Sequence, residues 1–201
     1  MRFWGSPPVH HELELKAVVR HPDIVRARLR AAGAVPRFIG RMSDLRYDRA
    51  AELASRDEVL RVRTYHHAGG RVEPVLAWKG PTMRSPEGYK LRREIELPIS
   101  GAADPGPLLG ALGFRAVHAI DRDVEVYALG DAIARLESYP RMDVLLEIEG
   151  DPAAIERAVA ASGIPRGEFT AESLADFVRR FEERTGLTAE LAGARPSEGR
   201  T

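Results

Sequence analysis

The chain has 201 residues, of which 44% are apolar, enough to bury the core of one domain and too many for general disorder. Its 30 basic and 30 acidic residues cancel, so no overall field favours nucleic acid or an anionic membrane. There is no cysteine, which excludes disulfides, thiolate metal sites and cysteine nucleophiles. Because we find neither a signal peptide nor an apolar run of about 18 residues, we expect a cytoplasmic protein.

Much of the chain shows an apolar period of two, which predicts β-strands. Gly69-Gly70 falls between the third and fourth predicted strands and indicates a hairpin. We expect strands at 9–20, 35–48, 58–66, 71–80, 88–98, 114–127, 131–138 and 142–149.

Four helices are predicted at 22–32, 105–112, 152–162 and 171–185. Each of the first three follows a strand with Glu-x-Glu, opens near a proline and ends near a glycine. We expect Thr170 to cap the last helix and Gly186 to end it. Residues 1–190 are interpreted as a single domain, and the polar tail 191–201 is predicted to be disordered.

Charged residues share one face of several predicted strands, as Glu12, Glu14 and Lys16 do in the first. For a single strand, the commonest meaning is a solvated outer face. The amphipathic helices, however, need an apolar sheet surface to cover, and about eight strands can close into a barrel. We therefore predict an α+β fold: a closed eight-stranded antiparallel barrel with helices outside and a charged lumen. An outer-membrane barrel is excluded because aromatic girdles are missing and helices interrupt the strands.

The predicted lumen carries both signs of charge, and unpaired burial of so many charges is very unfavourable. The basic candidates are Lys16, Arg61, Arg63, Lys79, Lys90, Arg92, Arg122 and Arg135, and the acidic ones are Glu12, Glu14, Glu94, Glu96, Glu137, Glu147 and Glu149. A polyphosphate with bound Mg²⁺ or Mn²⁺ would neutralise both sets of charges, because arginine and lysine bind phosphate and carboxylates bind hard cations. The alternative is an internal salt-bridge network without a ligand.

The same charges form short motifs in a fixed order. These are Glu12-Leu13-Glu14-Leu15-Lys16, Leu60-Arg61-Val62-Arg63, Trp78-Lys79-Gly80-Pro81, Arg92-Arg93-Glu94-Ile95-Glu96 and Glu147-Ile148-Glu149, with Arg122 before Tyr127 and Glu137 ten residues before Glu147. Over residues 10–185 this order resembles the CYTH superfamily of triphosphate tunnel metalloenzymes. That superfamily includes class IV adenylate cyclases, thiamine triphosphatases and inorganic triphosphatases.

The resemblance implies roles for the charged residues. It implies Lys16, Glu12 and Glu14 as catalytic residues and all eight basic candidates as triphosphate-binding residues. It implies that all seven acidic candidates are ligands of Mg²⁺ or Mn²⁺. Two departures from the family pattern are Val124, where a second basic residue is common, and Arg141-Met142-Asp143, where the family commonly has Gly-Leu-Gly.

The expected partner is a small triphosphate: ATP, thiamine triphosphate or tripolyphosphate. No nucleic acid or membrane partner is expected, and a homodimer is left open. We favour metal-dependent hydrolysis, which requires only water as nucleophile. The alternatives are a class IV adenylate cyclase, which forms cyclic AMP and pyrophosphate, and a non-catalytic binder of polyphosphates or nucleotides.

Overall fold

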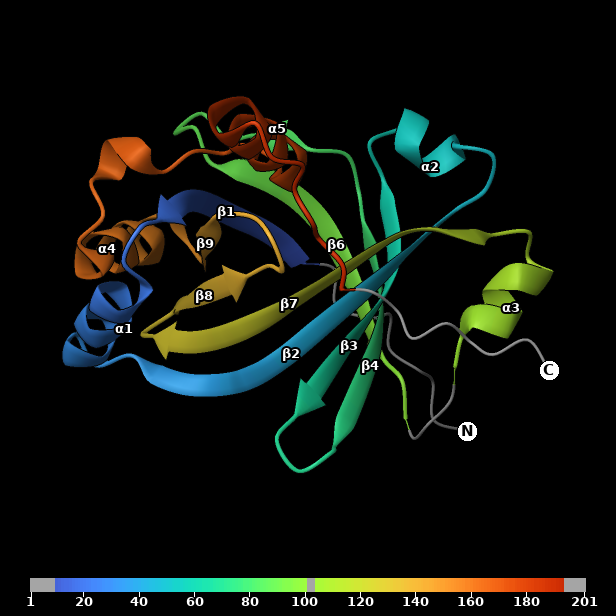
Figure 1. The fold of residues 1–201 in the computed structure, drawn as a ribbon, viewed down its shortest axis with the longest axis horizontal. Helices are drawn as coiled ribbons and strands as arrows, with labels where there is room; N and C mark the ends of the chain where they lie inside the picture. The colour runs from blue at the N-terminus through green and yellow to red at the C-terminus, as the bar shows by residue number, and fades with distance from the viewer. Residues whose placement is uncertain (1–9, 101–103, 194–201) are drawn as a thin grey trace.

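The protein is a closed β-barrel with helices on its outside, as the computed structural model of residues 10–100 and 104–193 shows (Figure 1). The strands are β1 (His10–Val19), β2 (Val35–Asp48), β3 (Val59–His67), β4 (Val72–Lys79), β5 (Met83–Arg84), β6 (Lys90–Pro98), β7 (Arg115–Leu129), β8 (Ala132–Ser138) and β9 (Val144–Glu149). They run antiparallel in the order β1-β9-β8-β7-β2-β3-β4-β6, and β1 also pairs with β6 and closes the ring. The predicted eight-stranded barrel is confirmed.

All eight predicted strands are present, because alternation is regular wherever one face of a strand is charged and the other is apolar. The two-residue β5 pairs only with β6 and was not predicted. Its length gives no periodic signal in the sequence.

Five helices and one 3₁₀ turn lie outside the barrel in the described part of the chain (Figure 1). They are α1 (Pro22–Ala31), α2 (Glu52–Ser55), α3 (Gly106–Ala111), α4 (Pro152–Ser162), η1 (Arg166–Glu168) and α5 (Leu174–Thr185). The unpredicted α2 is a single turn, and Asp48 at the end of β2 accepts hydrogen bonds from the amides of Leu53 and Ala54, both at 3.0 Å. None of these helices has the length and apolar character needed to cross a membrane.

The start of α5 differs from the prediction that Thr170 caps it. Ser173 is the N-cap and forms a capping box with Asp176, so the helix begins at Leu174. Thr170 instead bridges to β1, where its backbone exchanges hydrogen bonds of 2.9 and 2.8 Å with Lys16. Gly186 ends the helix in the left-handed conformation, as expected. Residues 194–201 of the tail that we expect to be disordered lie outside the described residues.

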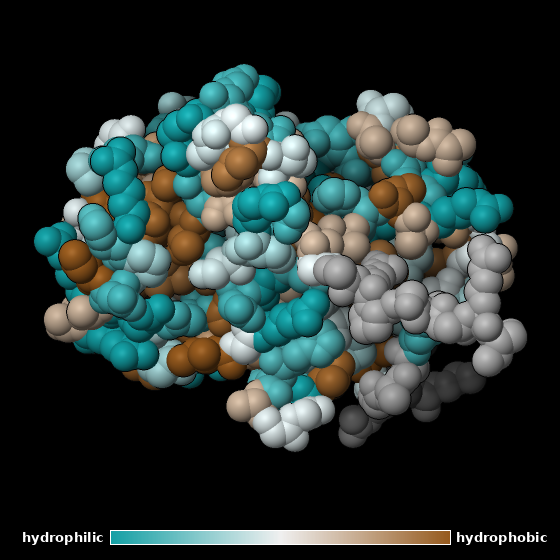
Figure 2. All heavy atoms as spheres, in the orientation of Figure 1, coloured by the Kyte–Doolittle hydropathy of each residue, from teal (hydrophilic) through white to brown (hydrophobic). Residues whose placement is uncertain are grey.

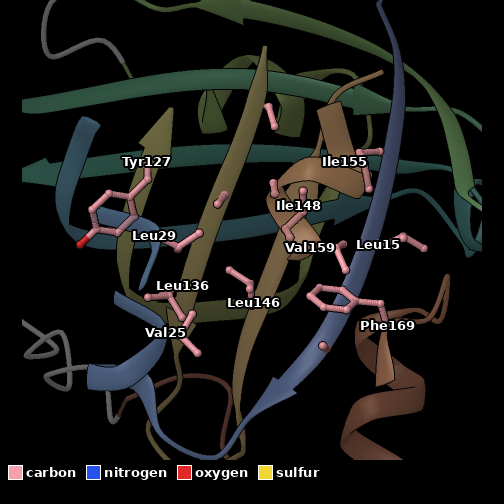
Figure 3. Close-up of a cluster of buried hydrophobic side chains, with 14 of the residues drawn as sticks. Leu15, Val25, Leu29, Tyr127, Leu136, Leu146, Ile148, Ile155, Val159 and Phe169 are labelled. Carbon is pink, nitrogen blue, oxygen red and sulfur yellow. The ribbon is translucent and has the colours of Figure 1, made fainter. Parts of the chain in front are cut away.

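The apolar core lies between the barrel wall and the helices (Figure 3). Leu15, Leu146 and Ile148 on β1 and β9 are 0–1% exposed, and Leu29 of α1 and Ile155 of α4 are fully buried in the same cluster. Because side chains alternate along a strand, this packing directs the charged residues of β1 and β9 into the barrel. The outer surface is mostly hydrophilic on the face drawn in Figure 2, with apolar groups in small scattered areas.

Candidate active site

A charged cavity of about 310 Å³ occupies the barrel. All eight basic residues predicted for the lumen line it: Lys16, Arg61, Arg63, Lys79, Lys90, Arg92, Arg122 and Arg135. Arg46, which the sequence analysis did not single out, is a ninth basic residue in the lining. Five acidic residues line the same cavity, and three more carboxylates form ion pairs with its cations, so the basic residues exceed the acidic ones by one: the three are Glu12 with Lys79, Glu94 with Arg61, and Glu149 with Arg135. Most of these cations are therefore paired with carboxylates, and the remaining positive excess favours an anionic ligand.

Lys16 lies at the junction of the charged faces of β1 and β9. Cross-strand register places it opposite Glu147, and it places Glu14 opposite Glu149. The Lys16 ammonium donates to Glu14 at 2.5 Å and forms an ion pair with Glu147. Burial opposes the charge on Lys16, but the two glutamates outweigh it and raise the pKa of the amine above its usual value. Lys16 is therefore a fixed positive charge.

Four carboxylates from β1 and β9 converge beside Lys16. One oxygen from each of Glu12, Glu14, Glu147 and Glu149 lies within 4.8 Å of the others. Burial, together with the charges of Glu12 and Glu147, raises the pKa of Glu149 well above its usual range, although Arg135 opposes the shift. Clustered carboxylates of this kind are what a hard divalent cation uses as ligands. The donor set therefore fits Mg²⁺ or Mn²⁺.

A chain of ion pairs connects this cluster to β4, β6 and β3. Lys79 contacts Glu12 at 2.5 Å and Glu94 at 3.0 Å, and Glu94 contacts Arg61 at 3.2 Å. Burial and the charge of Glu12 raise the pKa of Glu94 to about 7, against the lowering effect of Lys79. Glu94 is thus held near the cluster in a position where it can accept or release a proton near neutral pH.

Asp44 of β2 organises the arginines on the other side of the cavity. Its carboxylate accepts two hydrogen bonds from Arg63, at 2.8 and 3.0 Å, and one from Arg122 at 3.1 Å, and it lies 3.5 Å from Arg61. Burial opposes ionisation of Asp44, but the three guanidinium groups hold its pKa well below the usual range. Sequence reasoning missed this residue.

Two further acid–base groupings complete the lining. Arg122 donates to Glu137 at 2.9 Å, and the Tyr139 hydroxyl donates to the same carboxylate at 2.6 Å. Arg135 binds both Glu147 and Glu149. Tyr139 was not predicted because it follows the end of β8, beyond the alternating pattern.

Several arginine N–H groups in the cavity have no partner among the described residues. They are the buried Nε atoms of Arg46, Arg61 and Arg135 and one terminal nitrogen of Arg122. Buried polar groups are normally satisfied, and leaving one unpaired costs about 1–3 kcal/mol. Four such donors around one cavity match the many acceptor oxygens of a phosphate chain.

Glu96 and Arg92 are placed differently from the rest of the predicted set, whereas Lys90 remains in the charged network of the lumen. Glu96 is exposed and lines a second hollow with Glu12, Glu94 and Glu149. Arg92 donates to the carbonyls of Gly80 and Asp57, both at 2.6 Å, so part of its guanidinium holds the loop after β4. Lys90 contacts Glu14 at 2.5 Å.

The two sequence departures have clear structural positions. Val124 is 1% exposed and pairs with Glu137 across β7 and β8, so it places an apolar group beside Glu137. Arg141 pairs with Glu190 through the backbone, and Asp143 accepts hydrogen bonds from Arg184 at 2.7 Å. The altered turn thereby holds α5 and the segment after it against the barrel.

No family model and no curated protein matches the sequence. Among solved structures, a protein from Pyrococcus horikoshii aligns with a TM-score of 0.69 and 25% identity over 84% of this chain and 98% of that one. A proposed adenylate cyclase from Vibrio parahaemolyticus aligns at 0.68 and 16% identity, covering 85% and 98% of the two chains. A proposed adenylyl cyclase from Hippeastrum, described as having a dominant triphosphatase activity, aligns at 0.58 and 19% identity, covering 88% and 95%.

The chain has the CYTH fold. The resemblance inferred from the ordered motifs is confirmed. At these identities the likeness establishes the CYTH barrel, while the reaction must be argued from the lumen itself.

Proposed function

We propose that this CYTH protein hydrolyses a triphosphate in its barrel, with Mg²⁺ or Mn²⁺ as cofactor. The observation that carries the proposal is the pairing of two features in one lumen. A lining with nine basic residues, whose arginines include four buried N–H groups without a partner among the described residues, adjoins four converging carboxylates. Phosphate oxygens satisfy the first feature and a divalent cation satisfies the second.

The basic residues would bind and orient the phosphate chain. Arg61 and Arg122 each combine a contact to a carboxylate, which holds the side chain in place, with a buried N–H that has no partner among the described residues. Arg63 donates to Asp44 through both its Nε and one terminal nitrogen, so its main contribution to phosphate binding is its positive charge. Fixed donors of this kind stabilise charge that develops on a transferring phosphoryl group without reorganising.

Lys16, Glu12 and Glu14 would carry the chemical step. Lys16 remains protonated and neutralises charge on the phosphoryl oxygens, while Glu12 and Glu14 orient the attacking water. The water oxygen bonds to the terminal phosphorus, the bridging P–O bond breaks, and orthophosphate and diphosphate result from tripolyphosphate. A divalent ion held by Glu12, Glu14, Glu147 and Glu149 would supply charge neutralisation and polarise phosphate oxygens.

Cyclase chemistry is the second candidate, because the Vibrio parahaemolyticus neighbour is a proposed adenylate cyclase. There the ribose 3′-hydroxyl would attack the α-phosphorus of ATP and release pyrophosphate. The third candidate is a binder that holds a polyphosphate or nucleotide without turnover.

A substrate panel separates the three. Purified protein is given tripolyphosphate, ATP or thiamine triphosphate with Mg²⁺, Mn²⁺ or a chelator, and orthophosphate, pyrophosphate and cyclic AMP are quantified. We expect orthophosphate that depends on the metal. Cyclic AMP with pyrophosphate would favour the cyclase, and binding without any product would favour the binder.

The carboxylate cluster is tested with the variant Glu14→Gln, and Glu183→Gln is its matched control. The first removes a carboxylate of the cluster and should lower turnover at least about 100-fold. Glu183 is exposed on α5, 3.9 Å from Arg179, and its replacement should leave turnover unchanged. Full activity of Glu14→Gln would refute the assignment of the carboxylate cluster.

A further inference from the structure

Arg46 belongs to a row of basic side chains across three strands. On β2 it lies opposite Arg61 of β3 and His118 of β7, and all three line the cavity. Like charges directly opposite each other in a sheet repel. Burial, followed by the nearby charge of Arg61, lowers the pKa of Arg46, while Asp44 opposes that shift. The local field around Arg46 is therefore strongly positive.

No acidic side chain of the described residues forms an ion pair with Arg46. Its Nε is buried without a hydrogen-bond partner, in contrast to Arg63 and Arg122, whose Nε atoms are both taken up by carboxylates. Asp44 accepts from Arg63 and Arg122 and lies near Arg61, but no hydrogen bond or ion pair among the described residues joins it to Arg46. Arg46 is the cation of this cavity that most lacks an anion.

Charge is distributed unevenly along the lumen. The hollow lined by Glu12, Glu94, Glu96, Asp131 and Glu149 contains acidic side chains and no basic one among its described lining residues. Arg46 does not border that hollow; it lines the cavity together with exposed His118 and with Leu174 at the start of α5. Arg46 therefore lies away from the acidic hollow, in the part of the lumen whose described lining is rich in basic residues.

The terminal groups of candidate substrates differ in charge. A free terminal phosphate has two ionisable oxygens, whereas a phosphate esterified to a nucleoside or thiamine has one. A guanidinium binds two oxygens of one phosphate through parallel N–H donors. The only six-membered aromatic ring in the described lining is Tyr139, whose hydroxyl is bound to Glu137 and whose face lies 5.9 Å from the Arg122 guanidinium. The other aromatic ring of that lining is the exposed imidazole of His118, which lies opposite Arg46 on β7.

We propose that Arg46 is a specificity-determining residue that binds the unesterified far phosphate of an inorganic tripolyphosphate. It makes the cavity favour a free phosphate chain over nucleoside triphosphates. This inference rests on the proposed function and adds the substrate class and the residue that selects it.

The test compares Arg46→Gln, Arg46→Lys and the control Arg37→Gln, in which an exposed arginine of β2 is replaced. For each, kcat/KM is measured with tripolyphosphate and with ATP at fixed Mg²⁺. We expect Arg46→Gln to lower kcat/KM for tripolyphosphate at least about tenfold, which is the effect of losing one charged hydrogen bond. The same variant should lower kcat/KM for ATP less than about twofold. Arg46→Lys should recover part of the loss, and Arg37→Gln should match the parent protein.

Thermal unfolding separates this role from a structural one. Removing an uncompensated buried charge should leave the melting temperature of Arg46→Gln equal to or above that of the parent. Equal losses with both substrates, no loss with either, or a lowered melting temperature would overturn the inference.

If the parent protein turns over no triphosphate, the proposed function fails and the inference is judged by binding. Calorimetric titration with tripolyphosphate and with a non-hydrolysable ATP analogue then replaces kinetics. Tighter binding of tripolyphosphate that is lost in Arg46→Gln would support the role of Arg46. Equal affinities in the two proteins would overturn it.

Discussion

Asp44 holds three arginines whose mutual repulsion would otherwise oppose closure of the barrel. Replacing it by asparagine leaves Arg61, Arg63 and Arg122 without their shared counter-charge. Removing one partner of a buried ion pair is strongly destabilising, so Asp44→Asn should lower the free energy of unfolding by about 3–5 kcal/mol. Urea denaturation at neutral pH measures this change. Asp23→Asn is the control, because Asp23 is 95% exposed on α1, and it should change the free energy of unfolding by less than about 1 kcal/mol.

The lowered pKa of Asp44 should make the free energy of unfolding depend on pH in acid. The pKa of Asp44 is lower in the folded protein than its unfolded value of about 4, so its contribution is complete above pH 4 and is lost as the pH falls through the folded pKa. The difference in stability between the parent and Asp44→Asn should therefore shrink below about pH 4. A difference that stays constant from pH 7 to pH 3 would contradict the assignment of Asp44 as the ionised partner.

Whether a lumen residue could be predicted depended on its neighbours in sequence. Glu12, Glu14 and Lys16 were found because every second residue of β1 is charged and the others are apolar. Asp44 and Arg46 share a face of β2 with Met42, while Arg41 and Leu45 lie on the opposite face, so neither face is uniformly charged. Only the barrel, which brings β3 and β7 against β2, reveals their role.

At the scale of elements, α5 is joined to the cavity through its first turn. Ser173, Leu174 and Ala175 line the lumen, and the capping box of Ser173 and Asp176 fixes that turn. Ser173→Ala should reduce stability by about 1 kcal/mol, the usual effect of losing an N-cap, and should raise KM for the substrate. Ser100→Ala, at an exposed position between β6 and α3, is the matched control. An unchanged KM with the expected loss of stability would show that the turn has no part in binding.

The prediction that Thr170 caps α5 was wrong, although Ser173-Leu174-Ala175-Asp176 carries the spacing of a capping box in the sequence. Both Thr170 and Ser173 have hydroxyls suited to an N-cap, and Asp176 completes a capping box only with Ser173. The tertiary bridge between Thr170 and Lys16 keeps the preceding residues extended. The other helix positions followed from local signals, such as Asp151 before Pro152, where the Asp151 carboxylate accepts from the amide of Ala154 at 2.8 Å.

At the scale of the whole molecule, the lumen is charged before any ligand arrives. A ligand that neutralises both sets of charges should stabilise the fold by mass action, by about 2.7 kcal/mol at a concentration 100 times its Kd. For a protein of this size that corresponds to a rise in Tm of roughly 5–10 °C. Scanning calorimetry with tripolyphosphate and Mg²⁺ measures it, with Glu147→Gln and a chelator as controls. A rise of the same size in the presence of chelator would show that metal is not needed for binding.

In the proposed function, one lumen binds a divalent cation at its carboxylates and phosphate at its arginines. The direct test is a crystal structure of the parent protein with Mn²⁺ and tripolyphosphate. An anomalous difference map then locates the manganese. We expect an anomalous peak between Glu12, Glu14, Glu147 and Glu149, with phosphate oxygens on the guanidinium groups of Arg61, Arg122 and Arg135. Manganese and phosphate bound together outside the barrel, with these side chains unchanged in their contacts, would contradict it.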